Sequence, residues 1–353
     1  MRVALDVTPA LAGVTGVARY TLALTQALPS QQVDVRPFAI GRGRGSIPLG
    51  TRRVRLPLRL VQMGWRLGLP PWAEHLAAAP DLVHSCDLVP PPTRRPLVAT
   101  VHDLAALERP DLHPARAVVQ ARARLEALGR VAAVFPNSQA TASALARHGI
   151  GGERVIVVPL AAGPRPTSSA SKPSTLPYLL AVGEVAARKD YPTLLRAFAT
   201  GAAGQHRLVI VGPTGFRGEE VYDLAARLDL GDRVRFTGHV SDGTLASLYA
   251  GATALCFPSL AEGFGMPLVE AMQAELPIVA SDIDATREVA ADAALLFPAG
   301  DAAALAEALQ RITTEADLRD RLTTVGRSRA SLFTWERTVA ATVAGYQKVL
   351  GCE

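Results

Sequence analysis

The sequence predicts an α/β protein made of two doubly wound domains, and three observations lead to this. The chain has 353 residues, enough for two domains of ordinary size. Short apolar runs typical of buried parallel strands alternate with helix-forming segments. A stretch rich in Pro and Ser at residues 161–177 interrupts this alternation, which starts again at Tyr178. Residues 1–162 and 176–333 are therefore expected to form separate domains.

The first half begins with a strand that leads into a glycine-containing loop and a helix up to about Leu28. Gly13 and Gly16 in that loop are a weak phosphate-loop signal, because a third glycine and a downstream acidic residue are missing. A plain strand-to-helix turn is the alternative. Further helices are expected over 115–129 and up to Arg147, the latter capped by Asn137 or Ser138. The expected strands are residues 3–7, 33–40, 81–85, 97–101, 131–136 and 155–159.

Positive charge is concentrated in the first half of the chain. The net charge is +5, but residues 1–160 carry 19 Arg and no Lys against 10 acidic residues, and eight of these Arg lie between Arg36 and Arg66. Such asymmetry suggests an anionic partner, either a phospholipid surface or a lipid-diphosphate carrier. A solvated arginine-rich face is an equally good explanation. Nucleic acid is disfavoured, because Trp65 is the only aromatic residue among these arginines apart from Phe38 near their start.

The segment 41–70 is expected to be irregular, since it is rich in Gly, Pro and Arg with scattered apolar residues. Around 54–69 these residues can form an amphipathic, basic piece that contacts a membrane or an acceptor. A loop packed on its own domain is the alternative.

Composition excludes several classes of protein. Half of the residues are apolar, so disorder is not expected, and no run of about 18 apolar residues predicts a transmembrane helix. Cys86, Cys256 and Cys352 are too few and too scattered for a disulfide framework or a zinc site. The chain passes directly from Met1 into a strand pattern without a signal peptide, so a cytoplasmic location is expected, with peripheral attachment to the inner face of the membrane left open.

His102 and Asp103 directly follow the expected strand 97–101. A histidine at the carboxyl end of a parallel strand lies where ligands of such sheets bind. His102 can donate a hydrogen bond to a sugar hydroxyl, with Asp103 orienting the ring. A hydrogen-bonded structural histidine is the alternative, and this is the role we expect for His84.

The second half repeats the alternation, with the first strand ending before Arg188 and Lys189. Two basic residues at a strand-to-helix junction can clamp a diphosphate, although adjacent cations are often only solvated. The expected helices are a segment from Thr193, then 219–228, 245–250, 301–312, 316–332 and a last one to Leu350. The expected strands are residues 178–182, 208–211, 233–236, 252–257 and 278–280. The Asp-x-Asp sequence at 282–284 is not expected to bind metal.

The segment 258–270 is predicted to form a glycine-rich loop followed by a helix that begins near Pro267. Gly263 and Gly265 permit a tight turn and close approach of a ligand, and the helix start favours phosphate. Glu262 in the loop and Glu270 one turn into the helix can both accept hydroxyl hydrogen bonds. The alternative is an acidic loop with a Glu that complements the helix dipole.

These motifs resemble a known family. Glu262 and Glu270 set in Glu-Gly-Phe-Gly-x-Pro resemble the signature of the retaining nucleotide-sugar glycosyltransferases of family 4, which have the GT-B fold. Residues 16–20 are similar to a Gly-x-x-Arg-Tyr motif of one clade, and 100–104 resemble the family's His-Asp segment. The chain departs from the family at Glu184, where many members have Arg, and at Glu275, where Gly is usual.

The resemblance implies two Rossmann-like domains facing across a cleft: an acceptor domain over 1–162 with a crossover helix over 334–353, and a donor domain over 176–333. It implies transfer of a hexose from a nucleotide-sugar, with GDP-mannose favoured, to a lipid-linked or polysaccharide-precursor hydroxyl. No cofactor and no metal are expected. The alternatives are a sugar-nucleotide epimerase or hydrolase on the same fold, a transferase for a small soluble acceptor, a non-catalytic binder and a nicotinamide dehydrogenase.

The resemblance also assigns roles to individual residues. Glu262 would hold the donor sugar and His102 would position it, and these two are the expected catalytic residues. Glu270 would hold the ribose, while Arg188 and Lys189 would stabilise the leaving diphosphate. The remaining donor-binding residues would be Gly16, His239, Val240, Gly263, Phe264, Gly265 and Met266.

Overall fold

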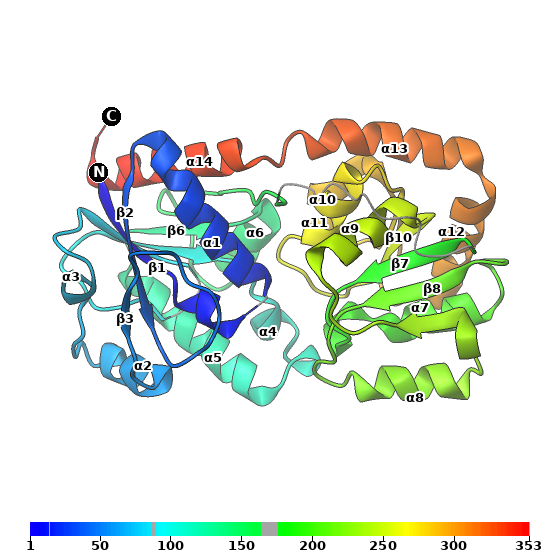
Figure 1. Ribbon diagram of the computed structural model, residues 1–353, viewed down its shortest axis with the longest axis horizontal. Coiled ribbons are helices and arrows are strands. Elements are labelled where there is room, and N and C mark those ends of the chain that lie inside the picture. Colours follow the sequence, from blue (N-terminus) through cyan, green and yellow to red (C-terminus); the bar gives the residue numbers. More distant parts are fainter. Residues whose placement is uncertain (14, 87–88, 164–175, 353) are drawn as a thin grey trace. The chain divides into compact units, whose positions relative to one another are not determined.

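The computed structural model describes residues 1–13, 15–86, 89–163 and 176–352. The chain divides into two compact units, which are described one at a time (Figure 1). Unit 1 comprises Met1–Glu108, Arg116–Ala161 and Thr334–Glu353, and unit 2 comprises Arg109–Ala115 and Ala162–Phe333. The last helix of the chain therefore belongs to the unit that contains the amino terminus.

Unit 1 is built on a parallel sheet in the order β3-β2-β1-β4-β5-β6. Its strands are β1 (Arg2–Asp6), β2 (Asp34–Ile40), β3 (Arg52–Val54), β4 (Leu82–Ser85), β5 (Leu97–Val101) and β6 (Ala133–Pro136). Its α-helices are α1 (Gly16–Ala27), α2 (Leu58–Arg66), α3 (Ala73–Leu76), α4 (Ala105–Glu108), α5 (Ala115–Ala127), α6 (Gln139–Arg147) and α14 (Trp335–Leu350).

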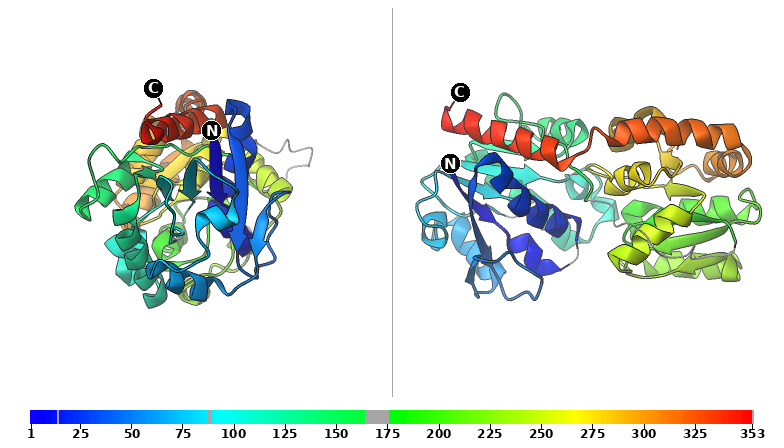
Figure 2. Two further views of the ribbon diagram at one scale, coloured as in Figure 1. Left: turned by 90° about the vertical axis from the view of Figure 1, so that its left-hand side faces the viewer. Right: turned by 45° about the horizontal axis from the view of Figure 1, so that its top comes forward.

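The core of unit 1 follows from strands that are apolar on both faces. Phe38, Val83 and Ala99 on three strands pack with Trp65 of α2 and Leu145 of α6. Helix α14 lies beside α1, as both views show (Figures 1 and 2). On α14 the hydroxyl of Thr338 donates to the carbonyl of Pro159 at 2.7 Å.

Unit 2 is built on a second parallel sheet, in the order β12-β11-β10-β7-β8-β9. Its strands are β7 (Tyr178–Val182), β8 (Arg207–Val211), β9 (Val234–Phe236), β10 (Ala254–Phe257), β11 (Ile278–Ser281) and β12 (Ala294–Phe297). Its α-helices are α7 (Tyr191–Ala199), α8 (Glu219–Arg227), α9 (Asp242–Gly251), α10 (Met266–Gln273), α11 (Asp284–Ala290), α12 (Ala302–Thr314) and α13 (Ala316–Ala330). Helix α7 packs against α8 and α12, while α10 packs against α11 and α13 (Figure 1).

The two sheets have the same topology. In each, the first three strands run outward to one edge and the next three run outward to the other, which is the doubly wound Rossmann order. The direction reverses between β1 and β4 in unit 1 and between β7 and β10 in unit 2. In open sheets of this kind ligands bind at the carboxyl ends of the strands beside that switch point. The expectation of two doubly wound Rossmann-like domains is therefore confirmed.

The expected strand over 155–159 is wrong in its extent. Only Val155 forms a bridge, with Val134, although the N–H groups of Ile156 and Val158 still donate to Val134 and Pro136. Pro136 has no N–H to return a bond to Ile156, so the parallel ladder is interrupted after its first step.

The structure also contains elements that the sequence pattern did not reveal. The segment 41–70, expected to be irregular, contains β3 and α2, and helix α11 was not expected. Strand β12 was not expected either. Strands β3 and β12 are edge strands of three and four residues, too short for a periodic signal.

Candidate functional site

The switch point of unit 2 brings together two segments that are more than seventy residues apart in sequence. Arg188 and Lys189 follow β7. Glu262 follows β10, the strand that is hydrogen-bonded to β7. The N–H of Leu260 donates to the carbonyl of Arg188 at 2.9 Å, which ties the two loops together through the backbone. The sequence-predicted Arg-Lys pair and the glycine-loop carboxylate therefore form one site.

The side chains in this site form a buried cluster of charges. Lys189 Nζ lies 2.5 Å and Arg188 Nη1 lies 3.1 Å from the same oxygen, Oε1 of Glu262. The Lys189 ammonium also lies 4.8 Å from the centre of the Phe257 ring. The side chains of Lys189 and Glu262 are only 7% and 10% exposed, and that of Arg188 is 27% exposed. Arg188 is therefore the cation that solvent or a ligand reaches first.

Burial and charge pairing act against each other on the ionisation of this cluster. Burial works to raise the pKa of Glu262, but Lys189 and Arg188 together bring it below the ordinary value of 4.5. Burial lowers the pKa of Lys189, and Glu262 opposes that change. Glu262 is thus an ionised carboxylate in a poorly solvated place, and two cations are held beside it.

Gly183 at the end of β7 makes room for the lysine. Its backbone has φ +147°, and a Cβ there would lie 2.9 Å from Cε of Lys189. The N–H of Gly183 donates to Val211 and its carbonyl accepts from the Tyr191 hydroxyl at 3.2 Å. A side chain at position 183 would push the lysine ammonium away from Glu262, and the positive φ is one that residues other than glycine rarely adopt.

The start of α10 differs from a standard phosphate-binding helix start. Gly265 is the residue before the helix, with φ +93°, and Met266 is the first helical residue. Pro267 has no N–H, and the N–H of Leu268 already donates to the Gly265 carbonyl at 2.9 Å. The phosphate site expected here therefore depends on the N–H groups of Gly265 and Met266. The buried ring of Phe264 packs edge-on against Phe333, so its side chain is engaged within unit 2.

Glu270 lies one turn into α10, as expected, and has a partner that sequence reasoning missed. The hydroxyl of Tyr249, near the end of α9, donates to Oε2 of Glu270 at 2.7 Å. Tyr249 is buried and lies on α9, the helix that precedes β10, so it holds the carboxylate from a neighbouring element. A tyrosine near the end of a helix carries no sequence signal for this role.

His239 and Val240 follow β9, which is the edge strand of the sheet and lies two strands away from β7. His239 is exposed and Val240 is half-buried. Gly238 just before them accepts a hydrogen bond from the N–H of Gly212, so the turns after β8 and β9 are joined. The expected backbone contact with a base remains a prediction.

His102 and Gly16 belong to unit 1, whereas the site residues described so far belong to unit 2. His102 follows β5, and its Nε2 lies 3.0 Å from the carbonyl of Cys86. Its ring packs against Tyr20 of α1 in a T-shaped arrangement, with centroids 4.9 Å apart. The side-chain amide of Asn137 donates to the carbonyl of His102 at 2.8 Å. Gly16 is the exposed first residue of α1, one turn before Tyr20.

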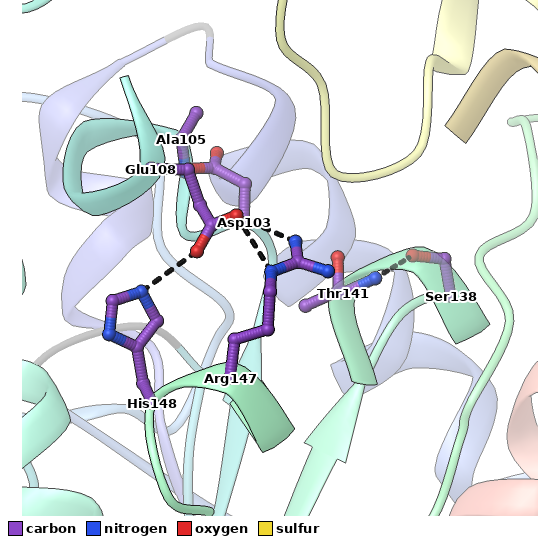
Figure 3. Close-up of polar contacts among 7 residues, drawn as sticks. All are labelled: Asp103, Ala105, Glu108, Ser138, Thr141, Arg147 and His148. Atoms are coloured by element: carbon purple, nitrogen blue, oxygen red, sulfur yellow. Dashed lines mark hydrogen bonds and ion pairs between the residues drawn. The ribbon is translucent and has the colours of Figure 1, made fainter. Parts of the chain in front are cut away.

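The segment after His102 is anchored on α6 (Figure 3). Asp103, expected to orient His102, instead accepts from the N–H of Ala105, the first residue of α4, at 3.1 Å. Glu108 at the end of α4 bridges Arg147 and His148, at 2.6 and 2.9 Å. Arg147 holds the pKa of Glu108 below its ordinary value.

Figure 3 also shows the start of α6, where Ser138 is the cap that accepts from the N–H of Thr141. Of the two residues considered for this cap, Ser138 is therefore confirmed. The side chain of Asn137 has another role. Its Nδ2 donates to the His102 carbonyl, and its Oδ1 accepts from the Thr141 hydroxyl at 3.0 Å.

His84 has the structural role expected of it. It is fully buried, and burial lowers the pKa of its imidazole to about 3, so the ring is neutral. Its Nδ1 lies 2.6 Å from the hydroxyl of Tyr346 on α14, and its Nε2 lies 2.8 Å from Thr100 Oγ1 on β5. Tyr346 and Thr100 were not singled out from the sequence.

The Asp-x-Asp segment is engaged with an arginine. Asp282 and Asp284 both form ion pairs with Arg287 of α11, at 2.5 and 3.1 Å. Within the described ranges no group of three or more His, Cys, Asp or Glu residues is arranged to hold a metal ion. No helix in those ranges combines the length and apolar character that crossing a bilayer requires.

Comparison with known protein families accounts for both units. The model described as Glycosyltransferase Family 4 matches residues 14–162, and the model described as Glycosyl transferases group 1 matches residues 167–329. The fold and the matches define a glycosyltransferase. The chain belongs to the family 4 glycosyltransferases, with their two-domain Rossmann-like GT-B fold.

Curated relatives include several mannosyltransferases. The chain is 27% identical over 265 residues to the O-antigen chain mannosyltransferase B of Escherichia coli, covering 71% of this chain and 70% of that protein. It is 37% identical over 146 residues to the phosphatidyl-myo-inositol mannosyltransferase of Mycobacterium leprae, covering 40% of this chain and 38% of that protein. A D-inositol 3-phosphate glycosyltransferase of Streptomyces bingchenggensis is 28% identical over 370 residues, covering 94% of this chain and 80% of that protein.

Solved structures agree on the fold. Sucrose-phosphate synthase from Thermosynechococcus elongatus superposes with a TM-score of 0.83 over 100% of both chains, at 22% identity. The lipopolysaccharide-biosynthesis glycosyltransferase WaaG superposes with a TM-score of 0.71 over 99% of this chain and 100% of the other, at 18% identity. At these identities the likeness shows the fold alone.

Proposed function

We propose that the protein transfers a hexose, with retention of anomeric configuration, from a nucleotide-sugar to an acceptor hydroxyl. The observation that carries this proposal is the cluster of Lys189, Arg188 and Glu262 at the switch point of unit 2. It places two cations and a carboxylate beside a helix start, a set of groups suited to a ligand with both phosphates and hydroxyls.

The cations act on the leaving group. As the glycosidic bond breaks, negative charge develops on the departing diphosphate, and fixed positive groups in a poorly solvated site stabilise it strongly. Arg188 is exposed enough to contact the diphosphate directly, while Lys189 supplies a buried positive field. The departing phosphate takes the proton of the acceptor hydroxyl, so a dedicated base is not required.

The carboxylates and His102 orient the donor. Both cations lie on Oε1 of Glu262, so Oε2 is outside these ion pairs and accepts from a donor-sugar hydroxyl. Glu270, held by Tyr249, accepts from the ribose. His102 donates to the transferred sugar, and Gly16 borders the diphosphate.

GDP-mannose is the proposed donor. The mannosyltransferase relatives from Escherichia coli and Mycobacterium leprae support mannose as the transferred sugar. The turn at His239 and Val240 would meet the nucleotide base through the backbone groups of the turn.

The proposed acceptor is lipid-linked and is met at an anionic membrane surface. Leu56, Leu60, Met63 and Leu67 recur at spacings of four, three and four along α2 and its flanks, and are 48, 64, 61 and 77% exposed. The opposite face of this helix, Val61 and Trp65, is buried in unit 1. An outward apolar stripe in a segment with eight Arg and no acidic residue between Asp34 and Glu74 fits an interfacial helix on anionic lipid.

A direct test begins with nucleotide binding. Thermal shifts with GDP, UDP, ADP and dTDP, with and without magnesium, should show selective stabilisation by GDP that is unchanged by the metal. Transfer from GDP-mannose to a polyprenol-linked saccharide should then give a product with the donor's anomeric configuration. Failure of all four nucleotides to stabilise the protein would contradict the proposed site.

A second candidate is transfer to a small soluble acceptor. The relatives described as D-inositol 3-phosphate glycosyltransferases favour it, since one aligns over 94% of this chain. Transfer to a water-soluble inositol phosphate in the absence of lipid would support this candidate. Loss of the sugar to water or its interconversion without any acceptor would indicate a hydrolase or an epimerase.

A further inference from the structure

Unit 1 contains a buried chain of hydrogen bonds that the proposed chemistry does not use. It runs from the Tyr346 hydroxyl to His84 Nδ1 at 2.6 Å, and from His84 Nε2 to Thr100 Oγ1 at 2.8 Å. The Tyr20 hydroxyl lies 3.3 Å from the same Thr100 oxygen. The chain thereby joins α14, β4, β5 and α1, which are far apart in the sequence.

All four members of this chain are neutral and removed from water. Each is at most 5% exposed. Burial lowers the pKa of His84 to about 3 and raises the pKa of Tyr346 and of Tyr20. A neutral imidazole has one donor nitrogen and one acceptor nitrogen, and each hydroxyl has one proton to donate. The orientation of each link therefore fixes that of the next, and a break leaves a buried polar group unsatisfied.

The chain ends against His102. The Tyr20 ring meets the imidazole edge-on, with centroids 4.9 Å apart and planes at 79°. The Nε2 of that imidazole also lies 3.0 Å from the carbonyl of Cys86, two residues after His84 on the segment that leaves β4. Both contacts thus come from parts of the chain whose positions the buried hydrogen bonds fix.

We propose that Tyr346 and His84 are positioning residues for His102, so that the last helix sets the orientation of the imidazole through Thr100 and Tyr20. This rests on the proposed function only in that His102 touches the transferred sugar. A purely structural network would instead stabilise unit 1 without affecting the imidazole.

The first test observes His102 without any activity. Tyr346→Phe removes one hydroxyl and keeps the ring. Thr342→Val is the matched control, since Thr342 is buried on the same helix and its hydroxyl donates to the Thr338 carbonyl within that helix. Histidine-ring NMR, with His102 assigned by its loss in His102→Gln, should show the His102 ring resonances shifted in Tyr346→Phe and unchanged in Thr342→Val. The Tyr20 ring current makes these resonances sensitive to the contact, and exposed His239 of unit 2 is an internal reference.

The second test is a double-mutant cycle on transfer. Tyr346→Phe should lower kcat about tenfold with donor KM within about twofold, and should cost less than about twofold when added to His102→Ala, because residues of one network are not additive. If Tyr346→Phe does not fold, Thr100→Val breaks the same chain at its middle with a side chain of similar shape.

The two tests separate the two proposals. Unchanged His102 resonances in a folded chain-breaking variant, or the same loss of kcat in both backgrounds, would overturn the positioning role. A wild-type protein without transfer activity would contradict the proposed function, and the resonances of His102 would still decide the role of Tyr346 and His84.

Discussion

The two units have the same strand topology but hold their candidate functional side chains by opposite physical means. In unit 2 the side chains beside the reversal are charged, and Glu262 is fixed by ion pairs to Lys189 and Arg188. In unit 1 the residues behind His102 are neutral, and His84 is fixed by hydrogen bonds to Tyr346 and Thr100. The same arrangement of strands thus supports one site that is held by ion pairs and one that is held by hydrogen bonds between neutral groups.

This difference determines how each site should respond to substitution. An ion-paired cluster depends on charge, so removing one member leaves another charge buried and uncompensated. A neutral hydrogen-bonded chain depends on shape and orientation, so removing one hydroxyl disturbs its neighbours without changing the net charge.

The largest effect is expected from Lys189→Ala. It removes a cation whose side chain is only 7% exposed, and loss of a preorganised group that stabilises developing charge typically lowers kcat by about 100- to 1,000-fold. Steady-state kinetics with a purified donor and acceptor measure this. The control is Arg287→Ala, which removes an ion-paired cation exposed on the same unit. Rates within about threefold of wild type for both Lys189→Ala and Glu262→Ala would show that the site is assigned to the wrong residues.

The comparison also predicts two separate pH windows for stability. Burial lowers the pKa of His84 to about 3, well below its ordinary 6.5. The unfolded chain therefore binds a proton there that folded unit 1 does not, and stability present above pH 6.5 is lost on acidification by up to about 1.4 kcal/mol per pH unit. Burial raises and Lys189 lowers the pKa of Glu262, with a net decrease, so its contribution is present above pH 4.5 and is lost only below it.

Hydrogen exchange measured by mass spectrometry can follow the two windows separately, after correction for the intrinsic pH dependence of exchange. Peptides of β4 and α14 should lose protection between pH 6.5 and 5, and those of β7 and β10 only below 4.5. His206 of unit 2, whose pKa burial also lowers, is replaced by Gln to remove its contribution. Simultaneous loss of protection in both units above pH 5 would show that His84 does not set the acid stability of unit 1.

The two sites were predictable from the sequence to different degrees. Lys189, Arg188 and Glu262 each follow a strongly apolar strand, and the doubly wound order brings the ends of β7 and β10 together. The sequence pattern therefore predicted both the fold and the members of this site. It did not predict that both cations share one oxygen of Glu262, because that depends on side-chain packing around Phe257 and Gly183.

In unit 1 the sequence pointed to His102 and to a structural role for His84, but not to Tyr346 as the partner of His84. Tyr346 lies 262 residues after His84, and its partnership depends on where α14 packs. A buried Tyr in a helix has the same pattern as any core aromatic residue, so periodicity cannot reveal its hydroxyl contact. Asp103 shows the opposite error, since adjacency to His102 suggested a pairing, whereas the carboxylate accepts from the backbone N–H of Ala105 two residues later.

A smaller effect is expected at Glu270, where unit 2 uses a neutral donor as unit 1 does. Tyr249→Phe removes the hydroxyl that bonds Glu270 at 2.7 Å and leaves the ring in the core. The carboxylate loses one of its restraints, so donor KM should rise about three- to tenfold with little change in kcat, as for one hydrogen bond to a charged group. Tyr222→Phe, which loses a bond to Thr214 at 2.8 Å, is the control. A fall in kcat at constant KM would indicate that Tyr249 acts on the reaction step instead.

The smallest effect is expected on the exposed face of α2, which lies within the arginine-rich segment 36–66 of unit 1. Removing one arginine near an anionic surface should weaken binding by about 1 kcal/mol, or about fivefold. Arg59→Gln should therefore lower sedimentation with phosphatidylserine-containing vesicles by that factor, and Leu60→Ser should also lower it by removing apolar contact. Val119→Ser, at a position 63% exposed on α5, is the matched control and should bind as wild type does.

Added salt should weaken the attraction, because exposed charges are screened within about 10 Å at 0.1 M ionic strength. If the wild-type protein binds anionic and neutral vesicles equally at low salt, the arginines of segment 36–66 do not bind a membrane. They then form only a solvated, positively charged face of unit 1.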